Sequence, residues 1–258
     1  MNLHIDNQCF IVGGASSGFG KATAEALLKE GAIVYGIARG ADRLQSLFER
    51  YPKRFVPVTG DLTTTETLDH LFELLDGHII SGALVNAGGP PAATFLETNL
   101  EDWDAAYRQV MRWKIDFSKR MIAHFKTQQY GRLVFVESVS VKQPIENLVL
   151  SNAFRLGVVG FVKTLAQEVA VQGITMNILA PGYHATPAIN RLIDKKVDTE
   201  NISKEAAQAA FTSQIPVGKM GAPDDFAALA VWLLSPQSRY LTGQTISVDG
   251  GVVQGVMG

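Results

Sequence analysis

The sequence predicts an α/β fold: a single doubly wound, Rossmann-type domain with an about seven-stranded parallel sheet and helices on both faces. Three observations predict it. Short apolar runs alternate with longer stretches of helical periodicity along the chain. The apolar runs are continuous, which is typical of parallel strands that are covered on both faces. No repeat, low-complexity tract or linker interrupts the alternation, so residues 1–258 are expected to form one domain.

The first half of the chain is expected to hold four strands joined by three helices. Apolar runs of strand length stand at 9–14, 32–38, 54–58 and 82–89. Stretches with apolar residues at helical spacing lie between them, at 18–30, 41–51 and 63–75. Each of these helices is read as a crossover that returns the chain to a parallel strand.

The second half continues the alternation and adds an insertion. Its strands are expected at 132–138, 174–182 and 244–251, and its helices at 100–127, 148–171 and 222–235. A polar, helix-prone insertion at about 186–214 is expected to form a helical lid over the substrate. Because ligands of doubly wound sheets bind at the carboxyl ends of the strands, site residues are expected in the loops that follow them.

Composition narrows the classes of function. Apolar residues make up 47% of the 258 residues, and the formal net charge is −2, so no nucleic-acid partner is expected. No unbroken apolar run reaches the length of a membrane span, and the N-terminus lacks the pattern of a secretion signal. Cys9 is the single cysteine, which fits the reducing cytoplasm. The five histidines are scattered, so no metal site is expected.

The turn after the first strand carries three glycines, Gly14, Gly18 and Gly20, between a strand and a helix. Glycine lets the backbone approach a ligand closely, and a helix start offers free N–H groups to phosphate. Ser16 and Ser17 add hydroxyl donors. The spacing differs from both the Gly-x-Gly-x-x-Gly fingerprint and the nucleoside-triphosphate loop. The turn is therefore interpreted as a dinucleotide phosphate site, with a plain strand-to-helix turn as the alternative.

The end of the second strand predicts which dinucleotide binds. Sites that prefer NAD carry an acidic residue there, whereas this chain has Ala38 followed by Arg39. A guanidinium suits a 2′-phosphate, so NADP(H) is expected to be preferred over NAD(H), and a solvated Arg39 is the alternative. Asp61 either touches the adenine or caps the helix that follows it. "NAGG", which begins at Asn86, adds a passage of small residues beside the cofactor.

Taken together, these features resemble the short-chain dehydrogenase/reductase family from Gly14 to Gly251. The marks are Gly14-x-x-x-Gly18-x-Gly20, Asp61-Leu62, Asn86-Ala87-Gly88, Ser138, Pro181-Gly182, Thr186 and the ending "LTGQTISVDGG". The chain is most similar to the β-ketoacyl carrier-protein reductases, and "NAGGPP" with "NLVLSN" looks like a divergent subgroup without the usual catalytic set. The resemblance implies cofactor contacts along these marks and at Phe19, with the nicotinamide near Pro181, Gly182 and Thr186. It also implies a homotetramer or homodimer built on the helices at 100–127 and 148–171.

Members of this family carry a tyrosine thirteen positions after the serine, a lysine four positions later, and a supporting asparagine. Counted from Ser138, the tyrosine position is Ser151 and the lysine position is Arg155, and the asparagine position falls on Val110. A serine hydroxyl is a far weaker acid than a tyrosine, and arginine cannot deprotonate. The resemblance therefore implies that Arg155 keeps the lysine's role in holding the cofactor ribose. Ser138 and Ser151 then form a two-hydroxyl cradle for an oxyanion.

Three other residues are candidates for a proton donor in place of the family's tyrosine. Lys142 lies in the loop after Ser138, and Tyr183 directly follows Pro181-Gly182. Lys114 lies four positions after Val110, on the same helix face. Each has a plainer alternative: a solvated loop lysine, a packing tyrosine and a subunit-interface lysine. Ser151 itself is alternatively a helix N-cap, and Arg155 alternatively a structural cation.

The favoured function is an NADP(H)-dependent oxidoreductase that acts on a ketone or alcohol, with a 3-oxoacyl thioester, free or carrier-bound, among the expected substrates. Three cations of the insertion, Arg191, Lys195 and Lys196, are expected either to meet an anionic substrate or to form a solvated face. One alternative is a non-redox NADP(H)-binding sensor or partner subunit. Another is a lyase or isomerase that uses the same pocket without hydride transfer.

Overall fold

A computed structural model describes residues 1–256 and contains the expected seven-stranded parallel sheet, in the order β3-β2-β1-β4-β5-β6-β7. The strands are β1 Cys9–Gly13, β2 Ile33–Ala38, β3 Phe55–Thr59, β4 Ile80–Val85, β5 Gly131–Val136, β6 Ile174–Pro181 and β7 Thr245–Val248. The chain order reverses between β1 and β4, so the crevice at their carboxyl ends is the topological switch point. The predicted doubly wound fold is confirmed.

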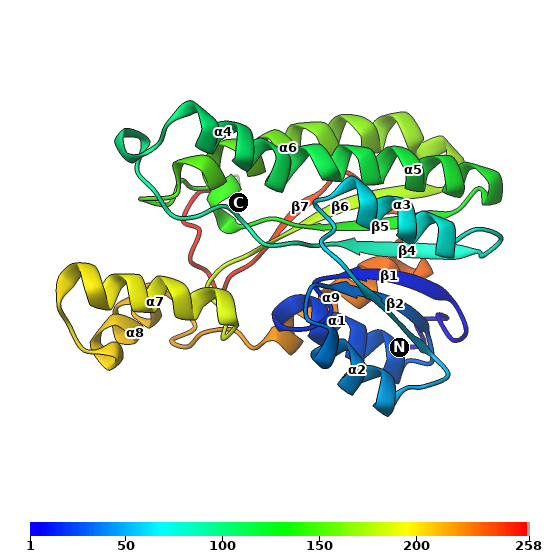
Figure 1. The fold of residues 1–258 in the computed structure, drawn as a ribbon, viewed down its shortest axis with the longest axis horizontal. Helices are drawn as coiled ribbons and strands as arrows, with labels where there is room; N and C mark the ends of the chain where they lie inside the picture. The colour runs from blue at the N-terminus through cyan, green and yellow to red at the C-terminus, as the bar shows by residue number, and fades with distance from the viewer. Residues whose placement is uncertain (257–258) are drawn as a thin grey trace.

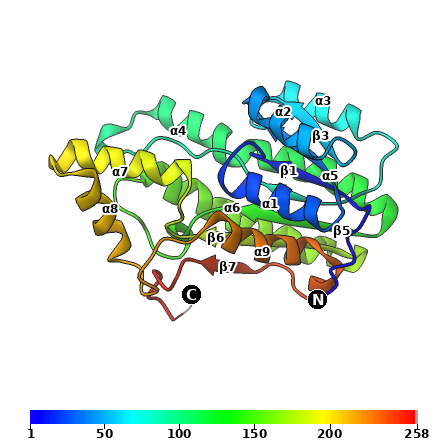
Figure 2. The same cartoon turned by 90° about the horizontal axis from the view of Figure 1, so that it is seen from below.

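Helices cover both faces of the sheet (Figures 1 and 2). One face holds α1 Gly18–Lys29, α2 Ala41–Arg50 and α9 Pro223–Leu234, whose buried residues join one apolar cluster. The other face holds α3 Thr65–Leu74, α5 Trp113–Gln128 and α6 Val149–Val169, which join a second cluster. The short helices are η1 Phe95–Glu97, η3 Val139–Val141, η4 Ala170–Gln172 and η5 Pro236–Ser238.

The long helix expected at 100–127 is interrupted in the structure. It consists of α4 Leu100–Tyr107, a π-helical turn η2 Arg108–Arg112, and then α5. A π turn leaves a backbone carbonyl with a changed partner, and here the indole of Trp113 donates to the Gln109 carbonyl over 2.8 Å. Val110 lies inside this turn and is buried, so the interruption falls at the position where the resemblance implies an asparagine.

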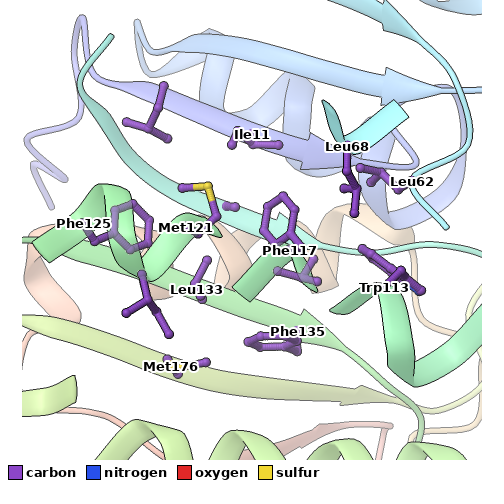
Figure 3. Packing of buried hydrophobic residues seen from close by; sticks show 14 of the residues in the cluster. Ile11, Leu62, Leu68, Trp113, Phe117, Met121, Phe125, Leu133, Phe135 and Met176 are labelled. Atoms are coloured by element: carbon purple, nitrogen blue, oxygen red, sulfur yellow. The ribbon is translucent and has the colours of Figure 1, made fainter. Parts of the chain in front are cut away.

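One face of α5 fixes the rotation of that helix against the sheet. Trp113, Phe117, Met121 and Phe125 recur every fourth residue and pack into the apolar cluster under the sheet, as Figure 3 shows. Each is at most 2% exposed. Because this stripe holds α5 in a single rotation, Lys114 next to Trp113 is also buried, at 3% exposure.

The insertion folds into two helices, α7 Pro187–Glu200 and α8 Lys204–Thr212, which lie beyond the end of the sheet (Figure 1). Thr186 precedes α7 and Pro187 occupies its first turn, a position that proline favours because it needs no N–H there. A small apolar cluster of its own, which includes Ile189, Ile193 and Ala207, holds the pair together. The helices were predicted; their role as a lid stays a prediction.

The outer face of α6 is largely uncovered and mixes apolar residues such as Leu156 with charged ones such as Lys163 and Glu168. The stretch Val149–Gln172 is long and apolar enough to cross a membrane by length and composition, with a mean hydropathy of 1.3 over an 18-residue window. In this fold α6 packs against β6 and η2. Only 28% of that window is buried, and the outer face of α6 joins α5 in a shallow apolar hollow that contains Phe161 and Leu165.

Candidate active site

A cavity of about 390 Å³ opens at the switch point, between the carboxyl ends of β1, β2 and β4. It collects most of the residues predicted to contact a cofactor. The predicted residues on its wall are Gly14, Ser16, Ser17, Gly18, Phe19, Arg39, Asp61, Leu62, Asn86, Ala87, Gly88 and Thr186. The loops after β1, β2, β3 and β4 therefore converge on one space, as the fold predicts.

The glycine turn has the geometry that a phosphate cradle needs. Gly14 adopts a φ of +68°, which side chains rarely tolerate, and a Cβ on Gly20 would lie 2.3 Å from the Gly14 carbonyl oxygen. The Asn86 side chain donates to the Gly13 carbonyl and ties the turn to the end of β4. Ser17 caps α1 without a side-chain hydrogen bond. The first amides of α1 are thus left for an anion, which fits the diphosphate of a dinucleotide.

At the far end of this cavity, two guanidinium groups gather beside an aspartate. The Nη1 of Arg39 lies 3.8 Å from Oδ2 of Asp61. The Arg39 side chain is 81% exposed, so it remains accessible to a ligand phosphate. Arg43 lines the same wall and was not predicted from the sequence. Asp61 accepts from the backbone and hydroxyl of Thr63, and Thr64 is the N-cap of α3, so the helix-capping alternative for Asp61 is wrong.

A second cavity of about 480 Å³ adjoins the first. The two share five wall residues: Phe19, Gly89, Thr186, Ala188 and Arg191. Ser138, Ser151, Arg155, Pro181, Gly182 and Tyr183 line the second cavity. The predicted residues Pro181, Gly182 and Arg155 therefore lie on the second cavity, and Gly20 lies behind the turn rather than on either wall.

Ser151 and Arg155 lie together at the wall of the second cavity. The Arg155 Nε donates to the Ser151 Oγ over 2.9 Å, because the four-residue spacing places both on one face of α6. The Nη1 of Arg155 donates to Glu137 Oε2 over 3.0 Å. The other oxygen of Glu137 accepts from the Lys114 ammonium. Ser151 lies in the first turn of α6, whose N-cap is Leu148, so the N-cap alternative for Ser151 is wrong.

The buried position of Lys114 excludes the subunit-interface alternative. Its side chain is 4% exposed and faces Glu137, which is fully buried. Burial lowers the pKa of Lys114 below its usual value, while the carboxylate of Glu137 opposes that effect. Lys114 does not line the second cavity, so it reaches the site through Glu137 and Arg155 rather than by direct contact.

The remaining candidate proton donors are placed less favourably. Lys142 ends η3 and lies outside the residues that line the second cavity. The hydroxyl of Tyr183 donates to Gln214 over 3.4 Å, toward the insertion, and burial raises the pKa of Tyr183. A raised pKa makes the phenol a weaker acid at neutral pH. Ser138 accepts from the Ser140 amide and lines the cavity.

Some site residues were missed by the sequence reasoning. Glu137 is the clearest case, and its signal is a single carboxylate that ends the otherwise apolar run "LVFVE". Gln109 lines the cofactor cavity and donates to the Gly89 carbonyl over 3.1 Å. Within residues 1–256, no three His, Cys, Asp or Glu side chains are grouped so that they could hold a metal ion.

Comparison with known proteins identifies the relatives of this chain. A family model described as enoyl-(acyl carrier protein) reductase matches residues 14–253. The NADPH-dependent reductase BacG of Bacillus subtilis is 29% identical over 94% of this chain and 96% of its own. The 3-oxoacyl-[acyl-carrier-protein] reductase FabG of Thermotoga maritima is 29% identical over 97% of this chain and all of its own length.

A solved structure extends the similarity to the overall fold. The L-sorbose reductase of Gluconobacter frateurii, solved with NADPH and L-sorbose, superposes with a TM-score of 0.92. It is 25% identical and covers 99% of this chain and all of its own.

Proposed function

Because this chain belongs to the short-chain dehydrogenase/reductase family, we propose that it transfers hydride between NADP(H) and a ketone or alcohol through an altered catalytic set. The first substrate class to test is a 3-oxoacyl thioester, free or bound to a carrier protein. The family and the oxidoreductase class rest on the match over residues 14–253 and on the reductases that resemble the chain along its length.

One observation carries the proposal: the two cavities meet. The first has the features of a dinucleotide site, and the second places Ser138, Ser151 and Arg155 beside their shared wall. A substrate in the second cavity would therefore lie against the reactive end of a dinucleotide in the first. Phe19 contributes to the walls of both cavities, and its ring packs edge to face against that of His184.

NADP(H) supplies the hydride when it is bound, and the chain supplies the charge that stabilises the reduced oxygen. Arg155 holds a permanent positive charge beside Ser151, since a guanidinium does not deprotonate at physiological pH. The Ser151 and Ser138 hydroxyls both line the cavity and can donate to one substrate oxygen. These groups stabilise a developing oxyanion, and the final proton then comes from solvent.

The charges near the substrate cavity favour an anionic substrate. Arg155, Arg191 and Lys195 line it, whereas its carboxylate, Glu137, is buried and paired with two cations. Lys195 reaches across from α7 and donates to the Ala92 carbonyl over 3.2 Å. A further cavity of about 620 Å³ adjoins this side and shares Tyr183 and Lys195, which leaves room for the long arm of a carrier thioester.

A second candidate is the reduction of a carbon–carbon double bond conjugated to a carbonyl. The observation that favours it is that the hydroxyl groups which line the cavity beside Arg155 are those of two serines, Ser138 and Ser151. Hydride addition to a conjugated double bond forms an enolate, whose oxygen needs electrostatic stabilisation rather than immediate protonation. The family model that matches the chain also carries the enoyl reductase description.

The experiment that tests the proposal is a nucleotide titration followed by a substrate panel. We expect NADPH to bind more tightly than NADH, and the absorbance of the reduced nicotinamide to fall with at least one substrate. Ketones, 3-oxoacyl thioesters and 2-enoyl thioesters are compared in parallel, because a response only to the last would favour the second candidate. Tight NADPH binding with no absorbance change across the panel would instead favour a non-redox sensor or partner subunit.

Assembly and location belong to the same proposal. We propose a homotetramer or homodimer in which a second copy covers the apolar hollow between α5 and α6, where Phe161 and Leu165 lie. The single cysteine, Cys9, supports a cytoplasmic location because the chain needs no disulfide.

A further inference from the structure

The charged side chains of Lys114, Glu137 and Arg155 form one ion network next to Ser151. Glu137 follows β5 and divides its two carboxylate oxygens between two cations. Lys114 of α5 approaches Oε1, and Nη1 of Arg155 from α6 lies 3.0 Å from Oε2. The same Nη1 also donates to the Val136 carbonyl over 3.4 Å. The guanidinium is therefore anchored at one end to the terminus of β5.

The burial of these three charged side chains is unfavourable for the free energy of folding. The Glu137 side chain is 0% exposed, Lys114 is 4% exposed and Arg155 is 12% exposed. Removing ions from water is energetically unfavourable, and apolar residues of similar volume often stabilise a core as well or better. A buried lysine and glutamate at these positions are therefore poorly explained by stability alone. Their shared contact is with the guanidinium that faces the site.

The network sets the direction of the hydrogen bond to Ser151. Arginine has donors and no acceptor, so the Ser151 oxygen must accept from Arg155 Nε. The hydroxyl hydrogen of Ser151 is then left for another acceptor, and the side chain lines the substrate cavity. A hydroxyl that accepts from a cation is also polarised, which strengthens the hydrogen bond that it donates.

The Nη2 edge of the guanidinium faces Gly89. A Cβ on Gly89 would lie 2.7 Å from Arg155 Nη2, so the guanidinium packs directly against the backbone of that glycine. Gly89 belongs to the wall shared by the two cavities. The Nη2 edge thus lies where the nucleotide site and the substrate site meet, while Nη1 and Nε are held by Glu137 and Ser151.

On the premise of the proposed function, we propose that Glu137 and Lys114 are positioning residues that hold Arg155 against Ser151. In that arrangement the Ser151 hydroxyl donates to the substrate oxygen, and the Nη2 edge of Arg155 faces the bound nucleotide. Lys114 shares the negative charge of Glu137 with Arg155. Its ion pair also holds Glu137 against α5. The pair acts on the reaction through Arg155, because the Glu137 side chain is fully buried and Lys114 lines neither cavity.

A double-mutant cycle tests this role. Glu137→Gln keeps the shape of the side chain and removes its charge, and Arg155→Met removes the guanidinium. If Glu137 acts through Arg155, each single variant lowers kcat by about 100-fold, and the double variant loses little more than Arg155→Met alone. Multiplied losses in the double variant would overturn the proposal. Glu25→Gln is the matched control, because Glu25 pairs with Arg50 outside both cavities.

A spectroscopic measurement gives a readout that does not need turnover. In protein labelled with nitrogen-15 arginine, the Arg155 Nε–H should give a slowly exchanging signal, assigned by its loss in Arg155→Met. We expect this signal to exchange rapidly in Glu137→Gln and to remain slow in Glu25→Gln. An unchanged signal in Glu137→Gln would overturn the positioning role. A wild type that shows the signal but reduces nothing would contradict the proposed function instead.

A charge-balanced variant covers the case in which Glu137→Gln fails to fold. Lys114→Met with Glu137→Gln removes one positive and one negative charge and leaves Arg155 without its anchor. We expect this variant to fold and still to lose the slow Nε–H signal, and to bind NADPH about tenfold more weakly. A folded variant that keeps the signal and the wild-type NADPH affinity would show that the pair is structural only.

Discussion

The Nε of Arg155 donates to the Ser151 hydroxyl over 2.9 Å, within one turn of α6. We infer from their spacing to Ser138 that Arg155 and Ser151 occupy the lysine and tyrosine positions of the family. In that case the arginine keeps a positive charge at the site, and no tyrosine hydroxyl serves as the acid there. The pair is better suited to stabilising an oxyanion than to delivering a proton.

Removal of the Ser151 hydroxyl should slow the reaction without weakening cofactor binding. Ser151→Ala is expected to lower kcat by about 100-fold, the effect of losing one oxyanion donor. The NADPH Kd should change by less than about twofold, because Ser151 lies outside the cofactor cavity. Steady-state kinetics and a fluorescence titration on one preparation check both values. An unaltered kcat would show that the Ser151 hydroxyl takes no part in the reaction.

Cofactor preference should depend on two guanidinium groups, that of Arg39 after β2 and that of Arg43 in α2. Arg39→Ala is expected to weaken NADPH binding by roughly tenfold while NADH binding stays unchanged, since only NADPH carries the 2′-phosphate. Arg43→Ala should act in the same direction, because Arg43 lines the same cavity. Competitive titration with both nucleotides provides the measurement. Arg50→Ala, whose side chain pairs with Glu25, is the control, and equal losses for NADH and NADPH would contradict the assignment.

The buried ammonium of Lys114 should make stability depend on pH. Burial lowers its pKa in the folded chain, whereas the unfolded chain keeps a value near 10.5. Between the two values the unfolded chain binds more protons at Lys114, so the free energy of unfolding rises with pH there. The rise is at most about 1.4 kcal/mol for each pH unit. Lys114→Met should lack this contribution.

Urea unfolding of both proteins at several pH values between about 7 and 10 isolates the contribution of Lys114. Tyr35, Tyr130 and Tyr183 have raised pKa values because they are buried, and they act in the opposite direction. Their effect is common to both proteins and cancels in the difference. Glu137 and Arg155 are the charged groups that face Lys114 and are also present in both. Parallel pH profiles would show that the Lys114 pKa is not lowered.

The apolar hollow on α5 and α6 should be an interface between copies. Leu165→Asp is expected to convert the wild-type oligomer to a smaller species, because burying an unpaired carboxylate there is unfavourable. Val171→Asp is the matched control, since Val171 is 88% exposed and lies beyond the hollow. Sedimentation velocity measures both. If Leu165→Asp sediments like the wild type, the hollow is not the interface.

The sheet, its helices and the cofactor turn could be predicted because each is encoded locally. Continuous apolar runs are typical of buried parallel strands, and three glycines mark the turn where backbone must approach a phosphate. The break in the long helix at Arg108–Arg112 could not be predicted, because no proline or glycine marks it and a π turn depends on tertiary packing.

The ion network of Lys114, Glu137 and Arg155 also could not be predicted from the sequence. Lys114, Glu137 and Arg155 come from parts of the chain that are distant in sequence, and only the packing of α5 against β4 and of α6 against β6 brings them together. The sequence placed Lys114 on the same face as Val110 but gave no partner for it. Glu137 could not be predicted as a site residue, because a single carboxylate at the end of a strand is usually solvated.

The most direct test of the account is the mass of the product formed with NADPH that is deuterated at the transferable position of its nicotinamide. The account predicts that a 3-oxoacyl or 2-enoyl thioester gives a product with one deuterium for each NADPH consumed. A product without deuterium, formed while the cofactor is unchanged, would contradict it and identify the chain as a lyase or isomerase that retains the nucleotide site.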